Sequence, residues 1–424
     1  MKKFILLLAY FINILSGFSQ QVVDTTQVVI LDRVNTTEST QKPYVILISA
    51  DGFRYDYAEK YNAKNINQMG QQGVKAKAML PSYPSITFPN HWSIITGLYP
   101  SHHGIVDNYF KDYNRNESYK MSSQQNAEDG SWYGGVPLWS LAESQGMLAA
   151  SLQWVGSASN AGGIRPTYYY RYHEKFTPQE KIKKVVDWLK LPENKRPHFI
   201  SLYFPEVDSA GHFYGPNSEQ TKQAVALVDQ AISKLIQEVG ALKLDNVNFI
   251  FVSDHGMKEI DGKKPIAIPF LLQDASKYEI NNAQTLLRVH VKNKNNIEKT
   301  YQKLNKKKTD NYNVYLASNF PDELHYGSKD DRYNRIGDIL LVPNSPYVFL
   351  ENWRKTSTGK HGYNVYTEPD MKAIFYAYGP AFNKNMEIEE FENIHIYPLI
   401  AKLLDLQIEK TIDGKQEILA PILK

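Results

Sequence analysis

Continuous apolar runs constrain the fold of this chain more than any other feature of its sequence. Residues 44–48, 199–203, 249–252 and 373–377 carry almost only apolar side chains, which is the pattern of strands that are covered on both faces. Between the second and third runs, residues 225–239 place apolar side chains at helical spacing. This alternation predicts an α/β fold with a mostly parallel central sheet and helices on both faces.

Acidic residues follow three of these runs at short distances. Asp51 comes three residues after the first run, Asp208 five after the second, and Asp254 two after the third. Ligands of open parallel sheets bind beyond the carboxyl ends of the strands. We therefore expect these three carboxylates to meet at one edge of the sheet.

Histidines accompany the carboxylates. His212 lies four residues after Asp208, His255 is adjacent to Asp254, and His361 follows after a long gap. Carboxylate and imidazole together are suitable ligands for zinc or a similar divalent ion. A single pair would equally fit a surface ion pair or a helix cap. The whole set is harder to explain by structural roles alone and has the composition of two divalent metal sites.

Thr87 is the candidate nucleophile. It lies in the segment Ser85-Ile-Thr87-Phe88-Pro89, where Pro89 suits the first turn of a helix and the threonine could act as its cap. The two roles are compatible, because a helix N-terminus favours both a nucleophile and an anion. Two metal ions can hold the attacking and leaving oxygens of a displacement at phosphorus. A hydroxyl bound to one of them becomes a nucleophile, so the sequence predicts a phosphate-ester hydrolase.

Length and composition set the expected domain organisation. The chain has 424 residues, 42% hydrophobic and 22% charged, enough for one large globular domain. Residues 1–19 have a basic start, a short apolar run and small residues, which predicts a cleaved signal peptide; an uncleaved anchor is the alternative. We expect a flexible N-terminus at 20–42 and a catalytic domain at 43–424, with an insertion at about 258–360 that breaks the strand and helix alternation.

Charge and cysteine content narrow the class of protein further. The net charge of +3 is too small to indicate nucleic-acid wrapping or membrane docking. The chain contains no cysteine, which excludes disulfides and cysteine ligands even for an exported protein. We expect a periplasmic or extracellular monomer that acts on a small molecule, forms no stable nucleic-acid complex and has no transmembrane segment in its mature form.

Five motifs, in order, give a specific resemblance. The chain resembles the nucleotide pyrophosphatase/phosphodiesterase family of the alkaline phosphatase superfamily from Val45 to about Leu406. The motifs are Thr87-Phe-Pro-Asn-His91, Thr96-Gly-Leu-Tyr-Pro100, His103-Gly-Ile-Val-Asp-Asn108, Ser253-Asp-His-Gly-Met257 and His361-Gly-Tyr363. The resemblance implies an alkaline phosphatase-like sandwich that hydrolyses nucleotide-type phosphodiester or pyrophosphate bonds.

The resemblance also implies roles for individual residues. Two Zn²⁺ ions are expected, with Thr87 ligated to the second and attacking phosphorus to form a covalent ester. Asn108 would donate, with the backbone N–H of the nucleophile, to a non-bridging phosphoryl oxygen. The metal ligands would be Asp208, His212 and His361 for the first ion, and Asp51, Asp254 and His255 for the second.

Aromatic residues fall where family members stack a base. Phe88, beside the nucleophile, is the strongest candidate, and Tyr169 and Tyr170 belong to a tyrosine cluster that also includes Tyr168 and Tyr172. Most of the 29 tyrosines are expected to be core residues.

Two departures from the family pattern remove no ligand. Val207 stands where a proline is common, and Asn364 stands where aspartate is frequent. We therefore expect activity to be retained.

Two alternatives compete with the diesterase. A phosphomonoesterase or sulfatase on the same scaffold would need extra cations for its more highly charged substrate, and no arginine adjoins Thr87 or Asn108. A non-catalytic exported protein with a structural metal pair would usually have closed four-ligand sites, whereas each expected group here has three protein ligands.

Overall fold

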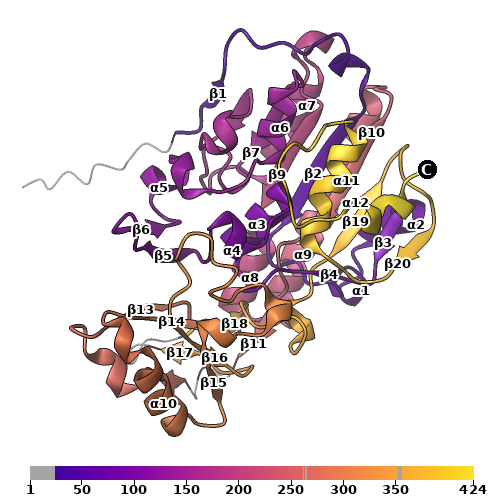
Figure 1. The fold of residues 1–424 in the computed structure, drawn as a ribbon. Helices are drawn as coiled ribbons and strands as arrows, with labels where there is room; N and C mark the ends of the chain where they lie inside the picture. The colour runs from indigo at the N-terminus through magenta and orange to yellow at the C-terminus, as the bar shows by residue number, and fades with distance from the viewer. Residues whose placement is uncertain (1–23, 261, 263–264, 351–355) are drawn as a thin grey trace, which may run out of the picture.

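The computed structural model describes residues 24–260, 262, 265–350 and 356–424, and the expected signal peptide lies outside this part. A nine-stranded sheet runs through the molecule (Figure 1). Its strands, in spatial order, are β1 (Gln27–Val29), β8 (Tyr168–Tyr170), β7 (Ala149–Leu152), β9 (Phe199–Phe204), β2 (Tyr44–Ala50), β10 (Val247–Val252), β19 (Phe375–Tyr378), β3 (Val74–Ala76) and β20 (Met386–Ile388).

The centre of the sheet is parallel, as the apolar runs predict. Strand β2 pairs in parallel with β9 on one side and with β10 on the other. Every residue of these three strands is buried. The fourth run, residues 373–377, contributes to β19, which pairs antiparallel to β10. The predicted α/β fold with a mostly parallel central sheet is thus confirmed.

Helices cover both faces of the sheet. Alternate residues of β2 point to opposite sides, so Val45 and Leu47 belong to one hydrophobic core and Ile46 and Ile48 to the other. The first core includes side chains of α3 (Thr87–Thr96), α6 (Leu138–Ser144) and α11 (Ile396–Leu403). The second includes side chains of α2 (Lys64–Gln72), α7 (Pro178–Leu189) and α9 (Glu219–Ala241).

The helix predicted at 225–239 lies within α9. Its apolar stripe is buried at Val225, Val228, Ile232 and Leu235, while the opposite face carries polar side chains. Ser218 caps its N-terminus by accepting a hydrogen bond from the Thr221 backbone N–H.

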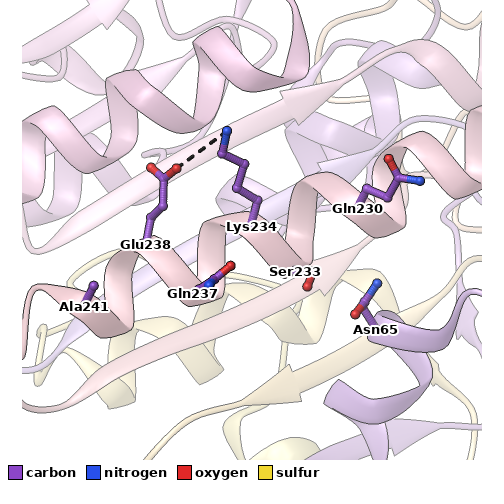
Figure 2. Close-up of a pocket in the computed structure, with 7 residues that line it drawn as sticks. All are labelled: Asn65, Gln230, Ser233, Lys234, Gln237, Glu238 and Ala241. Atoms are coloured by element: carbon purple, nitrogen blue, oxygen red, sulfur yellow. Dashed lines mark ion pairs between the residues drawn. The ribbon is translucent and has the colours of Figure 1, made fainter.

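An open pocket lies on the polar face of α9 (Figure 2). Lys234 and Glu238 form a partly exposed ion pair there, with Nζ and Oε1 3.7 Å apart. Neither group of metal-ligand side chains found among the described residues lies in this pocket. It is lined by Asn65, Gln230, Ser233, Lys234, Gln237, Glu238 and Ala241.

The described part of residues 258–360, called the insertion below, lies mostly at one end of the molecule (Figure 1), while Phe320, Tyr326 and Ile336 pack in the first core of the main sheet. An antiparallel sheet with its own hydrophobic core is covered by α10 (Ile297–Lys307). The strands of this sheet, in spatial order, are β13 (Tyr278–Asn282), β14 (Leu287–Val291), β16 (Ile339–Pro343) and β15 (Tyr312–Leu316).

The two ends of the insertion meet. Strand β11 (Lys258–Glu259) pairs antiparallel with β18 (Gly359–Lys360). This pairing brings the two ends of the insertion together and places His361 next to His255.

Within the described part of the chain, no helix is both long and apolar enough to cross a membrane.

Candidate active site

Asp51, Asp254 and His255 form the first cluster of potential metal ligands, called the Asp51 group below. Asp51 directly follows β2, and the other two residues follow β10, the parallel neighbour of β2. Parallel pairing places both strand ends at the same edge, so the side chains meet as predicted. His255 Nε2 lies 3.4 Å from Asp51 Oδ1 and 3.1 Å from Asp254 Oδ2. All three residues are buried.

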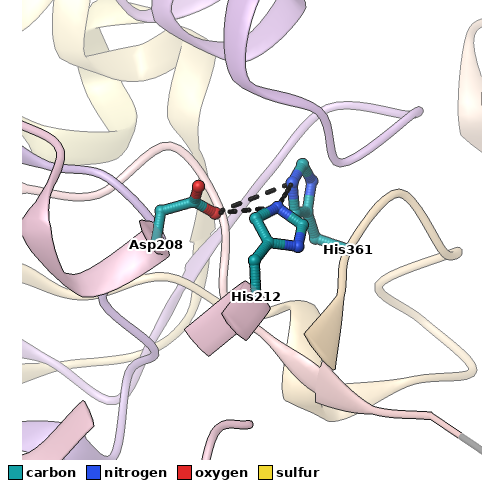
Figure 3. A group of neighbouring side chains, drawn as sticks. All are labelled: Asp208, His212 and His361. Carbon is teal, nitrogen blue, oxygen red and sulfur yellow. Dashed lines mark hydrogen bonds and ion pairs between the residues drawn. The ribbon is translucent and has the colours of Figure 1, made fainter. Parts of the chain in front are cut away.

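Asp208, His212 and His361 form the second cluster, called the Asp208 group (Figure 3). Asp208 and His212 lie four residues apart on α8 (Glu206–Tyr214), which puts them on one face of the helix. Asp208 Oδ1 is 3.4 Å from His212 Nε2 and 3.7 Å from His361 Nε2. The two imidazole Nε2 atoms are only 3.1 Å apart, so all three ligand atoms point at one place.

The outer nitrogens of these imidazoles are held by backbone carbonyls. His212 Nδ1 lies 2.8 Å from the Gly359 oxygen, and His361 Nδ1 lies 2.9 Å from the Ser85 oxygen. A ring that donates its Nδ1 proton to a carbonyl leaves Nε2 free as a lone-pair donor to a metal. His255 has the same arrangement with the Gly256 carbonyl, at 2.8 Å.

The Asp51 group and the Asp208 group are in direct contact. The rings of His255 and His361 stack with centroids 3.6 Å apart and an angle of 12° between their planes. One histidine belongs to each group, so the two sites are neighbours and could act on one substrate.

Three buried oxygens support metal binding. Asp51 Oδ1, Asp208 Oδ1 and Asp254 Oδ2 have no hydrogen-bond partner among the described residues, although a buried polar atom is normally paired. These are the same atoms that face the imidazole nitrogens. Divalent cations would satisfy them, so the side chains present fit the two-metal site that the sequence predicts.

The electrostatics of the groups also favour a cation. Burial, together with repulsion from Asp254 and Asp208, raises the pKa of Asp51 well above its ordinary value. Burial also opposes ionisation of Asp254, but His255 and His91 hold the pKa of that carboxyl well below its usual range. Burial and the neighbouring His255 and His212 lower the pKa of His361, which keeps its imidazole neutral, the form that binds metal.

Thr87 lies beside the Asp51 group. It is the first residue of α3, and its Oγ1 is 3.2 Å from His255 Nε2. Its backbone N–H is at the start of the helix, where no intrahelical acceptor exists. The hydroxyl therefore lies at the positive end of the helix, next to the Asp51 group.

Asn108 reaches the same helix start. Its Oδ1 accepts a hydrogen bond of 3.0 Å from the backbone N–H of Phe88. This contact uses the carbonyl end of the amide and leaves the Nδ2 donor for another acceptor. Asn108 thus acts as a cap supplied from a distant segment, a role that the sequence does not reveal.

The aromatic candidates divide into exposed and buried residues. Phe88 is partly exposed. Tyr169 and Tyr170 lie in β8 and are only 5% and 7% exposed. Tyr170 packs edge-on against Phe176, so this strand offers no open face for stacking, contrary to our expectation. Tyr172, by contrast, is 56% exposed and lies against Tyr203, near Asp51.

Two residues near the metal-ligand groups were not predicted from the sequence to belong to the site. The hydroxyl of Tyr203 donates a 2.6 Å hydrogen bond to Asp51 Oδ2, and His91 Nδ1 lies 3.3 Å from Asp254 Oδ2. Tyr203 ends an apolar strand and is indistinguishable by pattern from a core residue. His91 stands in the motif that begins at Thr87, which was the one signal available.

Comparisons with known proteins agree with this geometry. The family model described as "Type I phosphodiesterase / nucleotide pyrophosphatase" matches residues 45–364. The chain therefore belongs to the nucleotide pyrophosphatase/phosphodiesterase family.

Named relatives extend the match over most of the chain. Venom phosphodiesterase 2 of Crotalus adamanteus is 35% identical over 394 residues, which cover 89% of this chain and 48% of the relative. Human ectonucleotide pyrophosphatase/phosphodiesterase family member 1 is 35% identical over 377 residues, covering 86% and 40%. The chain thus spans about half the length of the curated relatives it matches.

Solved structures show the same fold. Murine ectonucleotide pyrophosphatase/phosphodiesterase 5 superposes with a TM-score of 0.82 at 28% identity, covering 91% of this chain and 100% of the murine one. An inactive threonine-to-alanine variant of that protein, in complex with AMP, superposes equally well over 90% of this chain and all of the murine one. The predicted alkaline phosphatase-like fold is confirmed.

Proposed function

We propose that this protein is an exported zinc-dependent phosphodiesterase/pyrophosphatase that cleaves nucleotide-type phosphodiester or pyrophosphate bonds through a covalent Thr87 ester. The observation that carries the proposal is the position of Thr87 Oγ1, 3.2 Å from a histidine of one metal-ligand group that stacks on a histidine of the other. Family membership supports it, as does the murine relative that is inactive as a threonine-to-alanine variant.

The two groups would hold two zinc ions, one in each. Bound there, the ions supply Lewis-acid stabilisation of the attacking and leaving oxygens. The Asp208 group leaves its site open, because three protein ligands leave room for substrate. Tyr203 fixes the Asp51 carboxylate through the hydrogen bond described above.

Thr87 is the nucleophile in this scheme. In the first step its Oγ loses its proton and forms a bond to phosphorus, while the bond from phosphorus to the leaving oxygen breaks and that oxygen takes up a proton. In the second step water attacks phosphorus, the bond to Thr87 breaks, and the threonine hydroxyl is restored. The leaving oxygen departs on the side opposite Thr87, as an in-line displacement requires.

Asn108 and the N-terminus of α3 stabilise charge that develops on the phosphoryl group. Nδ2 of Asn108 and the Thr87 backbone N–H donate to a non-bridging oxygen. Both donors are neutral, which suits a singly charged diester better than a doubly charged monoester. Phe88 and the exposed Tyr172 provide aromatic faces on which a base can stack.

The proposal also includes the substrate and the location of the enzyme. The substrate is a small nucleotide or other phosphodiester, and the enzyme works as a monomer in the periplasm or outside the cell. The expected signal peptide supports export, as do relatives named as venom and ecto-enzymes.

The test is replacement of Thr87. Thr87→Ala should lower kcat for a p-nitrophenyl nucleotide diester by about 10³-fold or more and retain two bound zinc ions, measured by elemental analysis. Thr96→Ala is the matched control, because Thr96 lies on the same helix and its hydroxyl donates to the Trp92 carbonyl. A Thr87→Ala enzyme with near-normal kcat would contradict the nucleophile assignment.

A further inference from the structure

A side chain of the insertion contacts the segment that carries Asn108. Arg288 lies in β14 and is fully buried. One terminal nitrogen of its guanidinium donates 2.7 Å hydrogen bonds to both Asp107 Oδ2 and the Tyr109 carbonyl. These two residues flank Asn108, so one arginine is hydrogen-bonded to the chain on both sides of Asn108.

Further hydrogen bonds hold the segment around Asn108. Asp107 Oδ1 accepts a 2.6 Å hydrogen bond from the backbone N–H of Asn108. Tyr326, also in the insertion, donates from its hydroxyl to the Val106 carbonyl at 2.8 Å. The backbone around Asn108 is therefore held by side chains of the insertion, while the Asn108 amide itself is held by the start of α3.

Packing alone gives no reason for this ion pair. Arg288 is 0% exposed and the Asp107 side chain 4%, and removing two charges from water costs several kcal/mol per ion. Burial raises the pKa of Asp107, an effect that Arg288 opposes. Apolar side chains would fill the same space without that cost. What the pair adds is a directional contact that sets the register of the chain at Asn108.

A second buried arginine of the insertion offers a comparison. Arg335 donates from Nε to Asp112 Oδ2 at 2.9 Å and from one terminal nitrogen to the Gly104 and Trp132 carbonyls at 2.7 and 2.8 Å. Asp112 is the last residue of β5 (Tyr109–Asp112), beyond the segment that holds Asn108. Arg335 is thus also buried and also paired with an aspartate, and the partners named here do not include the two residues that flank Asn108.

We propose that Arg288 is a positioning residue, through which the insertion aims the Asn108 amide at the non-bridging phosphoryl oxygen. This inference rests on the proposed function and adds a role for the insertion in that reaction. It requires that losing Arg288 harm the phosphoryl contact more than it harms substrate binding.

The test measures kcat and KM of the zinc-loaded full chain with a p-nitrophenyl nucleotide diester and its Rp and Sp phosphorothioate forms. Arg288→Met should lower kcat about 10-fold or more with little change in KM, because an oxyanion donor acts in the transition state. It should also reduce the preference between the two phosphorothioates. On an Asn108→Ala background, which should itself lose about 100-fold in kcat, the same change should have almost no further effect.

Arg335→Met is the matched control and should keep both the phosphorothioate preference and most of kcat. If Arg288→Met folds poorly, the double variant Asp107→Asn with Arg288→Met removes both charges and should show the same loss of preference. The proposal is overturned if a folded Arg288 variant keeps kcat and preference, if its effect adds to that of Asn108→Ala, or if Arg335→Met behaves identically. A wild-type protein without diesterase activity would instead refute the proposed function.

Discussion

At the scale of single residues, the proposed metal site depends on side chains that orient the candidate ligands. Tyr203 is the clearest case, because its hydroxyl satisfies Asp51 Oδ2 while Asp51 Oδ1 stays free for a cation. Partners of this kind typically contribute 10–100-fold to metal affinity.

Tyr203→Phe should therefore weaken zinc binding by about 10-fold or more without removing any ligand. The measurement is a competition titration of the apo protein with zinc and a coloured chelator. Tyr168→Phe is the control, since the Tyr168 hydroxyl also donates a hydrogen bond, to the Lys195 carbonyl, on the same sheet. Equal zinc affinity for Tyr203→Phe and the wild type would show that the hydrogen bond does not orient Asp51.

The convergence of the candidate ligands was predictable where sequence proximity or strand ends placed them. Asp51 and Asp254 follow apolar runs, and His212 follows Asp208 at helical spacing, so their convergence could be foreseen. Tyr203 and Arg288 could not be, because each acts through a partner more than 150 positions away. Nothing in a single sequence reports such pairings.

At the scale of elements, the two groups meet because the loop after β2 packs directly on α8. Gly52 makes this possible: its φ of +66° suits glycine, and a Cβ there would lie 2.9 Å from the Asp208 Cα. The backbone that follows Asp51 thus touches the backbone that carries Asp208. A side chain between them would separate the two halves of the site.

Gly52→Ala should destabilise the fold by about 1–3 kcal/mol and lower diesterase activity beyond what unfolding explains. Gly163→Ala is a matched control, because Gly163 also has positive φ, +94°, but open space around its Cβ position. Denaturant unfolding and kcat of the two variants separate backbone strain from the clash. Full activity in a folded Gly52→Ala enzyme would mean that the contact does not set the spacing of the groups.

Element prediction succeeded for long buried strands and failed for short ones. The apolar runs located β2, β9 and β10, whose side chains are buried on both faces. Tyr169 and Tyr170 are candidates for base stacking by sequence, but they lie buried in β8 between β1 and β7. A three-residue aromatic run has too few positions for periodicity to distinguish a strand from an exposed loop. The apolar pattern also could not predict the direction of a strand, and β19 is antiparallel to β10.

At the scale of the whole molecule, buried unpaired carboxylate oxygens in both groups predict that metal stabilises the fold. Removing zinc with a chelator should lower the melting temperature, and adding zinc back should restore it. A ligand at 100 times its Kd contributes about 2.7 kcal/mol. Asp254→Asn, which removes a buried charged ligand, should show a smaller shift on zinc addition. An unchanged melting temperature after verified zinc removal would contradict this expectation.

In the proposed function, the two groups, loaded with metal, and Thr87 together hydrolyse diesters. The most direct test compares initial rates on a p-nitrophenyl nucleotide diester and on p-nitrophenyl phosphate, after chelation and after zinc restoration. We predict a strong preference for the diester that disappears on chelation and returns with zinc. Preference for the monoester, or hydrolysis that persists without metal, would contradict the account.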